Sequence, residues 1–211
     1  MNDVIDELAG IAPGSRLSMA RDGRLEARRA AQQSYELLLH PEMPGEVLLL
    51  ERRILAAFVV ALHEDEVGNG TTGKTVLDHY GKLLEQTDES VFDIVLAEAE
   101  RGRTRGPYGH FPKGPLSAED KDGLHYTISI SGREKFGDRL SAALEHAHLL
   151  VFHPRDARSS DLQRLLDAGW STPGIVTLSQ LVAFLSFQLR VILGLTRAQS
   201  AFDKSQKVTH A

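Results

Sequence analysis

The stretch GIVTLSQLVAFLSFQLRVILGL, from Gly174 to Leu195, decides how the whole sequence is interpreted. It approaches the length of about 20 nearly uninterrupted apolar residues that a membrane-spanning helix needs. Polar side chains interrupt it, namely Ser179, Gln180, Ser186, Gln188 and Arg190. Three of these fall near one helical face, which is typical of a core helix or a subunit-interface helix. We therefore expect a long helix in a protein without a membrane partner.

Start and stop signals surround this stretch. Thr172 and Pro173 suit the opening of the long helix, because proline is favoured in a first turn. Before it, Ser160 can cap a helix that runs through Ala168 and is closed by Gly169. The last third of the chain is thus predicted to be helical.

Apolar residues at helical spacing predict three earlier helices. They are Ala27, Ala31, Tyr35 and Leu38 within Asp22 to Leu39; Val76, Leu77, Tyr80, Leu83 and Leu84; and Leu140, Ala143, Leu144, Ala147 and Val151. His153 and Pro154 stop the last of these helices.

The remaining segments raise the question of β-structure. The run from Val47 to Leu62 is apolar almost all round and predicts a buried helix or, alternatively, a buried strand. Residues 124–130 alternate as in a strand but have no obvious pairing partner. Glycine and proline dominate the segment from Gly106 to Pro115, which predicts a long loop. Because strands and helices do not alternate, we predict an all-α fold.

Composition narrows the function classes. A chain of 211 residues with 42% hydrophobic content suits one domain, predicted over 1–200 with a flexible tail at 201–211. The net charge of -5 offers no general attraction to nucleic acid. The acidic start MNDVIDELAG lacks the features of an export signal, so a cytoplasmic location is expected. The chain has no cysteine, which excludes thiol chemistry, disulfides and cysteine-ligated metals.

Two segments resemble the carboxymuconolactone decarboxylase and AhpD-like alkylhydroperoxidase superfamily. LLLERRILAAFVVALHED, residues 48–65, is similar to the helix that leads into the Cys-x-x-Cys-x-x-x-His motif of peroxidase-related members. LSAALEHAHLLVFHPRDA, followed by the segment from residue 162 to residue 195, resembles the closing pair of helices. The resemblance covers somewhat under half of the chain. It implies an AhpD-like helical domain that forms a homo-oligomer.

The catalytic residues of that family are largely missing here. If Glu51 is the first acid of the family's Glu-x-Glu pattern, the second falls on Arg53. Asp65 and Gly68 stand where the two cysteines belong. A thiol peroxidase needs a thiolate to attack the peroxide and a second thiol to resolve the product. We therefore expect the peroxidase activity to be absent, which leaves open whether the chain is an enzyme at all.

What can remain is a pocket for a small organic ligand. Glu51, His79 and Tyr80 are the candidate groups that could bind such a ligand or move a proton. His79 follows an insertion but has a helical setting similar to that of the family's histidine. No cofactor is expected. A further hypothesis is that the chain is a non-catalytic subunit for a cysteine-bearing AhpD-like relative.

The segment GNGTTGKT, Gly68 to Thr75, is a competing signal because it matches the phosphate-loop pattern G-x-x-x-x-G-K-[ST]. It would place Lys74 on nucleotide phosphates and Thr75 on Mg²⁺. The motif requires a buried strand directly before Gly68, and HEDEV intervenes. We favour a flexible loop in which Thr71 or Thr72 caps the next helix.

Nine histidines invite a metal hypothesis, above all His146 and His148 in EHAH. Residues two apart on a helix point to different faces, and zinc needs three or four convergent ligands. We therefore predict no metal site and a structural or surface role for these histidines.

Overall fold

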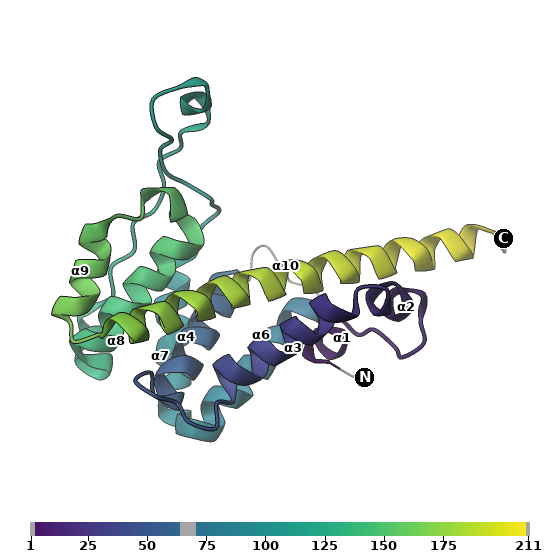
Figure 1. Cartoon of the computed structure of the whole chain (residues 1–211), viewed down its shortest axis with the longest axis horizontal. Helices are drawn as coiled ribbons and strands as arrows, with labels where there is room; N and C mark the ends of the chain where they lie inside the picture. The colour runs from purple at the N-terminus through teal and green to yellow at the C-terminus, as the bar shows by residue number, and fades with distance from the viewer. Residues whose placement is uncertain (1–2, 64–70, 210–211) are drawn as a thin grey trace.

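The structure, a computed structural model, describes residues 3–63 and 71–209, with the backbone alone at residues 71, 73, 74 and 204–209. Figure 1 shows its elements. They are α1 (Val4–Leu8), α2 (Arg16–Asp22), α3 (Leu25–Leu39), α4 (Leu49–Leu62), α6 (Thr71–Asp88), η1 (Glu89–Val91), α7 (Phe92–Gly102), η2 (Pro115–Glu119), α8 (Ile130–Phe152), η3 (Pro154–Asp156), α9 (Ser159–Asp167) and α10 (Thr172–Thr209). The described residues contain one isolated β-bridge, Gly109 to Lys121, and no strand. The all-α prediction is confirmed.

Helix α4 is the centre of the core. From Ile54 to Leu62 every side chain is almost fully buried, and α4 packs against α6, α7, α8 and α10. A helix that is apolar all round is stable only when neighbours cover all of its faces, as they do here. The alternative prediction of a buried strand at this segment is therefore wrong.

Helix α10 has two different halves. Its first half buries Leu178, Leu181, Leu185 and Leu189 against the body. In its second half Leu195 and Phe202 are partly buried against the core, and only the last turns project beyond the body (Figure 1). At 38 residues the helix is about 57 Å long. By length and composition, Thr172–Asp203 also qualifies as a candidate membrane span, although half of its most apolar window is buried inside the protein. The helix continues to Thr209, so residues 201–209 of the segment expected to be a flexible tail are helical in backbone, and the flexibility of the tail stays a prediction.

The second half of the chain builds the wall of the candidate site. Helix α8 begins at Ile130, ten residues before the first residue of the predicted apolar stripe, and changes direction at Gly137, whose φ is 70°. It ends at Phe152, before His153 and Pro154, as predicted. The long segment between α7 and α8 projects from the body as an arm, and its last part, residues 124–129, returns along α8 as extended chain (Figure 1). This extended segment and α9 lie on either side of one cavity.

Candidate functional site

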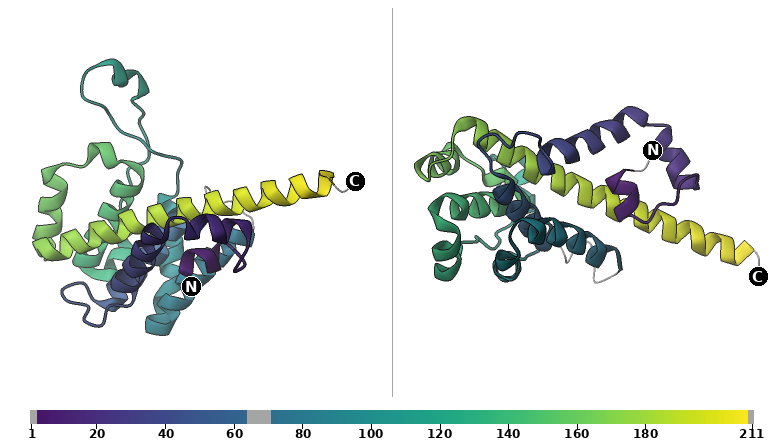
Figure 2. Two further views of the ribbon diagram at one scale, coloured as in Figure 1. Left: turned by 45° about the vertical axis from the view of Figure 1, so that its right-hand side comes forward. Right: turned by 90° about the horizontal axis from the view of Figure 1, so that it is seen from below.

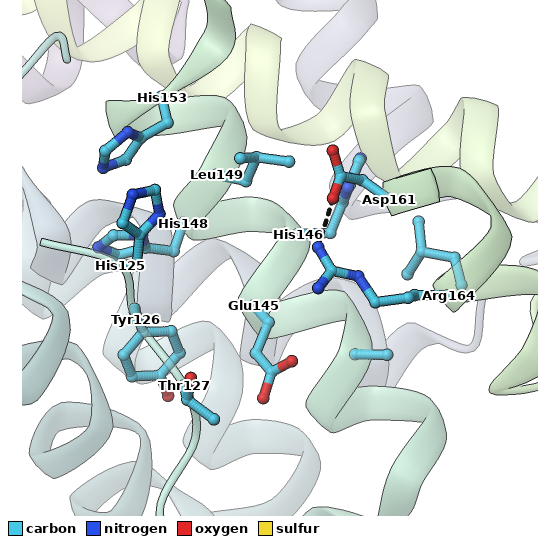
Figure 3. Close-up of a pocket in the computed structure, with 12 residues that line it drawn as sticks. His125, Tyr126, Thr127, Glu145, His146, His148, Leu149, His153, Asp161 and Arg164 are labelled. Carbon is cyan, nitrogen blue, oxygen red and sulfur yellow. Dashed lines mark hydrogen bonds and ion pairs between the residues drawn. The ribbon is translucent and has the colours of Figure 1, made fainter. Parts of the chain in front are cut away.

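A cavity of about 180 Å³ lies between α8, α9 and the extended segment before α8. We call it the His146 cavity. Its polar lining consists of His125, Tyr126, Thr127, Glu145, His146, His148, His153, Asp161 and Arg164. Figure 3 shows two walls: His125, His148 and His153 gather on one side, and His146 lies beside Asp161 and Arg164 on the other.

His146 is the unusual residue of this cavity. It is 6% exposed, and neither of its ring nitrogens has a hydrogen-bond partner among the described residues. Burial lowers the pKa of His146, with Asp161 raising it and Arg164 lowering it further. A neutral imidazole offers one N–H donor and one nitrogen acceptor. Because buried polar groups are nearly always paired, two unpaired nitrogens in a cavity wall indicate a place for a ligand or ordered water.

The two carboxylates of the cavity are already engaged with donors. Asp161 accepts from the backbone N–H of Arg158 at 2.8 Å and pairs with Arg164. Glu145 accepts from Arg133 at 3.0 Å and from the backbone N–H of Ile128 at 3.2 Å. Their charges are therefore matched by neighbouring groups, and His146 has no such partner.

The opposite wall is held by structural contacts. His148 donates from Nε2 to the carbonyl of Gly102 at 2.9 Å, and burial is the main cause that lowers the pKa of His148 to about 4. The rings of His125 and His153 stack with centroids 4.3 Å apart. His153 bonds the carbonyl of Leu124 at 2.9 Å through Nε2 and the carboxylate of Asp156 at 3.1 Å through Nδ1. This wall fixes the shape of the cavity.

The arrangement suits hydrogen bonding and proton transfer. Within residues 3–63 and 71–209, no group of three or more histidine, aspartate and glutamate side chains converges as a metal site would require. A neutral, buried histidine can accept a proton at one ring nitrogen and donate from the other. The cavity can therefore orient a small polar molecule and exchange a proton with it.

Glu51, the first of the predicted site residues, has a structural environment. One carboxylate oxygen accepts from the backbone N–H of Leu48 at 2.9 Å, and the other accepts from Nε of Arg139 at 2.8 Å. Arg139 also donates to the carbonyl of Gly169 at 2.6 Å and lies over the ring of Trp170 at 4.0 Å. Glu51 thus joins the start of α4 to α8 and to the turn before α10.

His79 and Tyr80 lie in another cluster. The Tyr35 hydroxyl bonds Nε2 of His79 at 2.9 Å and Nε2 of His40 at 3.0 Å. Burial lowers the pKa of His79 and raises that of Tyr35 to about 12. The Tyr80 hydroxyl donates to the side-chain oxygen of Gln188 in the core.

His79 and Tyr80 are neighbours in the sequence, with ring centroids 5.1 Å apart, but their polar groups bond different partners, and Glu51 has partners of its own. None of these three residues lines the His146 cavity. The sequence predicts a structural or surface role for the histidines of EHAH. A buried histidine on an apolar helix was the one available signal, and the position of α9 over α8 has no local signature.

The phosphate-loop segment lies at the edge of the described structure. Gly68, Asn69 and Gly70 fall outside the described residues, as does Asp65. Thr71 opens α6, so Thr71 and Thr72 lie in its first turn and Gly73 and Lys74 lie within the helix. The last described element before them is α4, a helix, whereas a phosphate loop follows a strand.

No protein-family model, curated protein or solved structure matches the chain.

Proposed function

We propose that the chain is an AhpD-like helical protein that binds a small polar organic molecule in the His146 cavity and acts on it by acid–base chemistry, without a thiol. The observation that carries the proposal is His146 itself, a buried imidazole whose two nitrogens are unpaired in a cavity wall. The absence of cysteine in the sequence removes the chemistry that the resemblance would otherwise suggest.

The lowered pKa of His146 supports the role of a base. A histidine that stays neutral at pH 7 can take a proton from a bound ligand, whereas a charged one cannot. A ligand with a donor and an acceptor satisfies both ring nitrogens, which neither a hydrocarbon nor a simple ion does. Lactamide is a suitable probe because it is small and uncharged and carries both donors and a carbonyl acceptor. γ-Butyrolactone is the comparison probe, because it carries acceptors only and can pair with one ring nitrogen.

Titration calorimetry with the two probes tests the proposal. Lactamide is expected to bind the wild-type protein more tightly than γ-butyrolactone does, and His146→Phe is expected to abolish lactamide binding by removing both polar atoms. His110→Phe is the matched control, because His110 is exposed on the arm and does not line the cavity. Absence of binding to wild type, or equal binding to the His146 variant, would contradict the proposal.

The proposed absence of peroxidase activity has a separate test. Peroxide consumption in the presence of a dithiol reductant is expected to stay at the rate measured without protein. Robust turnover would contradict the inactive-peroxidase proposal, because no thiolate is present to form the sulfenate.

We also propose a homo-oligomer. Exposed apolar side chains at α9 and at the start of α10 support it: Leu162 is 44% exposed, Leu166 41% and Val176 51%. Leu162 and Leu166 are four residues apart and therefore share one helix face. A Leu162→Glu, Leu166→Glu double variant is expected to sediment as a smaller species than wild type, and an unchanged mass would contradict this contact.

A further inference from the structure

A second cavity, with a mostly apolar lining, lies where the N-terminal helices meet α10. We call it the N-terminal groove. It measures about 270 Å³ and is lined by residues of α1, α2, α3 and α10. Figure 2 shows α2 and α3 beside α10 in the view from below, and α10 packs against α1 and α3. Its lining is apolar except for three arginines, and the lining residue Phe187 is 49% exposed.

Two of the three arginines have their charge matched. Arg28 donates from Nε to Asp3 at 2.6 Å and also pairs with Asp6 and Asp22. Arg21 donates to Asp3 at 2.9 Å and pairs with Asp6. These ion pairs hold both guanidinium groups in place and balance their positive charge, so neither group is available to pair with an anionic ligand.

Arg24 is different. It lines the groove, it is exposed, and no carboxylate of the described residues lies within ion-pair distance of its guanidinium group. Arg24 immediately precedes α3, whose further contributions to the groove are Ala27, Arg28 and Ala31. It therefore places a guanidinium group without an ion-pair partner among the described residues at the end of the wall that α3 provides.

The dimensions of the groove suit a single extended chain. Along α10 its lining runs from Phe187 to Leu195, which is about 12 Å at the rise of an α-helix. Small side chains on the facing wall, Ala20, Ala27 and Ala31, leave space for an alkyl chain beside α10. An apolar groove with an exposed guanidinium group at one end is complementary to a molecule with an apolar tail and one anionic head.

We propose that the N-terminal groove binds an aliphatic carboxylate of medium chain length, with the alkyl chain against Ala27 and Phe187 and the carboxylate at Arg24. Arginine is suited to this role because its planar guanidinium group binds a carboxylate with two parallel hydrogen bonds. The site is separate from the His146 cavity and shares no lining residue with it.

Titration calorimetry with decanoate, below the concentration at which it forms micelles, tests the proposal. Decanoate is expected to bind the full chain, and Ala27→Trp is expected to abolish binding by filling the groove. Ala30→Trp is the matched control, because Ala30 lies on the same helix and outside the groove. Arg24→Gln is expected to weaken decanoate binding about fivefold and to leave the binding of decanol unchanged, and Arg29→Gln is expected to change neither.

Three results would overturn the proposal. The first is no binding of decanoate, and the second is loss of binding in Ala30→Trp as complete as in Ala27→Trp, which would indicate damage to α3. The third is a sedimentation experiment in which Ala27→Trp splits a larger native species, because the groove would then be covered by a second copy of the chain. The circular dichroism spectrum of Ala27→Trp, compared with that of wild type, checks that the variant is correctly folded.

Discussion

Arg139 donates from Nε to a carboxylate oxygen of Glu51 at 2.8 Å while its guanidinium group lies 4.0 Å above the ring of Trp170. Glu51 comes from the start of α4, Arg139 from α8, and Trp170 from the turn that precedes α10. The ion pair and the stacking contact of Arg139 therefore connect three segments that are distant in sequence. Glu51, a candidate for ligand binding or proton transfer in the sequence, therefore has a carboxylate engaged in structural contacts.

The first prediction follows from that contact. Glu51→Gln removes the charge that faces Arg139 and is expected to lower the free energy of unfolding by about 1–3 kcal/mol. Chemical denaturation measures the change. Probe binding at the His146 cavity is expected to stay unchanged, and a variant that loses probe binding while keeping wild-type stability would contradict the structural role.

The second prediction concerns His148 and the pH dependence of stability. Burial is the main cause that lowers its pKa from 6.5 to about 4 in the folded protein. Between these pH values the unfolded chain binds a proton that the folded chain does not, so stability is full above pH 6.5 and falls as the pH falls towards 4. The loss due to this residue is about 3 kcal/mol.

Urea denaturation of wild type and His148→Gln at a series of pH values measures the loss of stability due to His148. Glutamine can donate to the carbonyl of Gly102 but does not titrate, so the variant is expected to lose less stability than wild type between pH 6.5 and pH 4. Parallel curves for the two proteins would show that His148 is not buried as a neutral ring.

The third prediction concerns the N-terminal helices. Burial would raise the pKa of Asp3, but the backbone N–H of Asp6 and the guanidinium groups of Arg21 and Arg28 hold it below its usual value. The contribution of Asp3 to stability is therefore present above about pH 4 and disappears as the pH falls through the lower pKa of the folded state. Asp3→Asn is expected to lower stability at pH 7 by more than at pH 2, measured by thermal unfolding at both pH values.

The fourth prediction uses two glycines as a matched pair. A Cβ at Gly132 would lie 2.7 Å from Oε1 of Glu98 and 2.9 Å from Ile128, so Gly132→Ala is expected to cost about 1–3 kcal/mol. A Cβ at Gly194, inside α10, would meet nothing within 4 Å, and Gly194→Ala is expected to stabilise the helix by about 0.5–1 kcal/mol. Changes of opposite sign in the free energy of unfolding, measured by chemical denaturation, would confirm the packing at the two glycines. Equal changes would contradict it.

Local periodicity predicted most of the fold. The apolar stripe around Tyr80 and the proline after His153 predicted α6 and the end of α8 closely. The segment at Val47–Leu62 was ambiguous because a run that is buried on all sides has no periodicity, and only its neighbours make it a helix.

The candidate site was less accessible to sequence reasoning for the same reason. The surroundings of His146 are formed by α9 and by the extended chain before α8. Neither segment forms a recognisable sequence motif with His146. Glu51, by contrast, was a candidate in the sequence because a carboxylate within an apolar, buried segment requires a partner. Its partner Arg139 lies 88 residues away, and no spacing rule connects the two.

The most direct test is ring-nitrogen NMR of His146 in the protein labelled at histidine, recorded at pH 7 with and without lactamide. We predict the signature of a neutral ring in the free protein and a shift of its nitrogen resonances when lactamide is added, with His148 unchanged in protonation. A charged His146 ring, or nitrogen resonances that do not respond to lactamide at saturating concentration, would contradict the proposed role of His146.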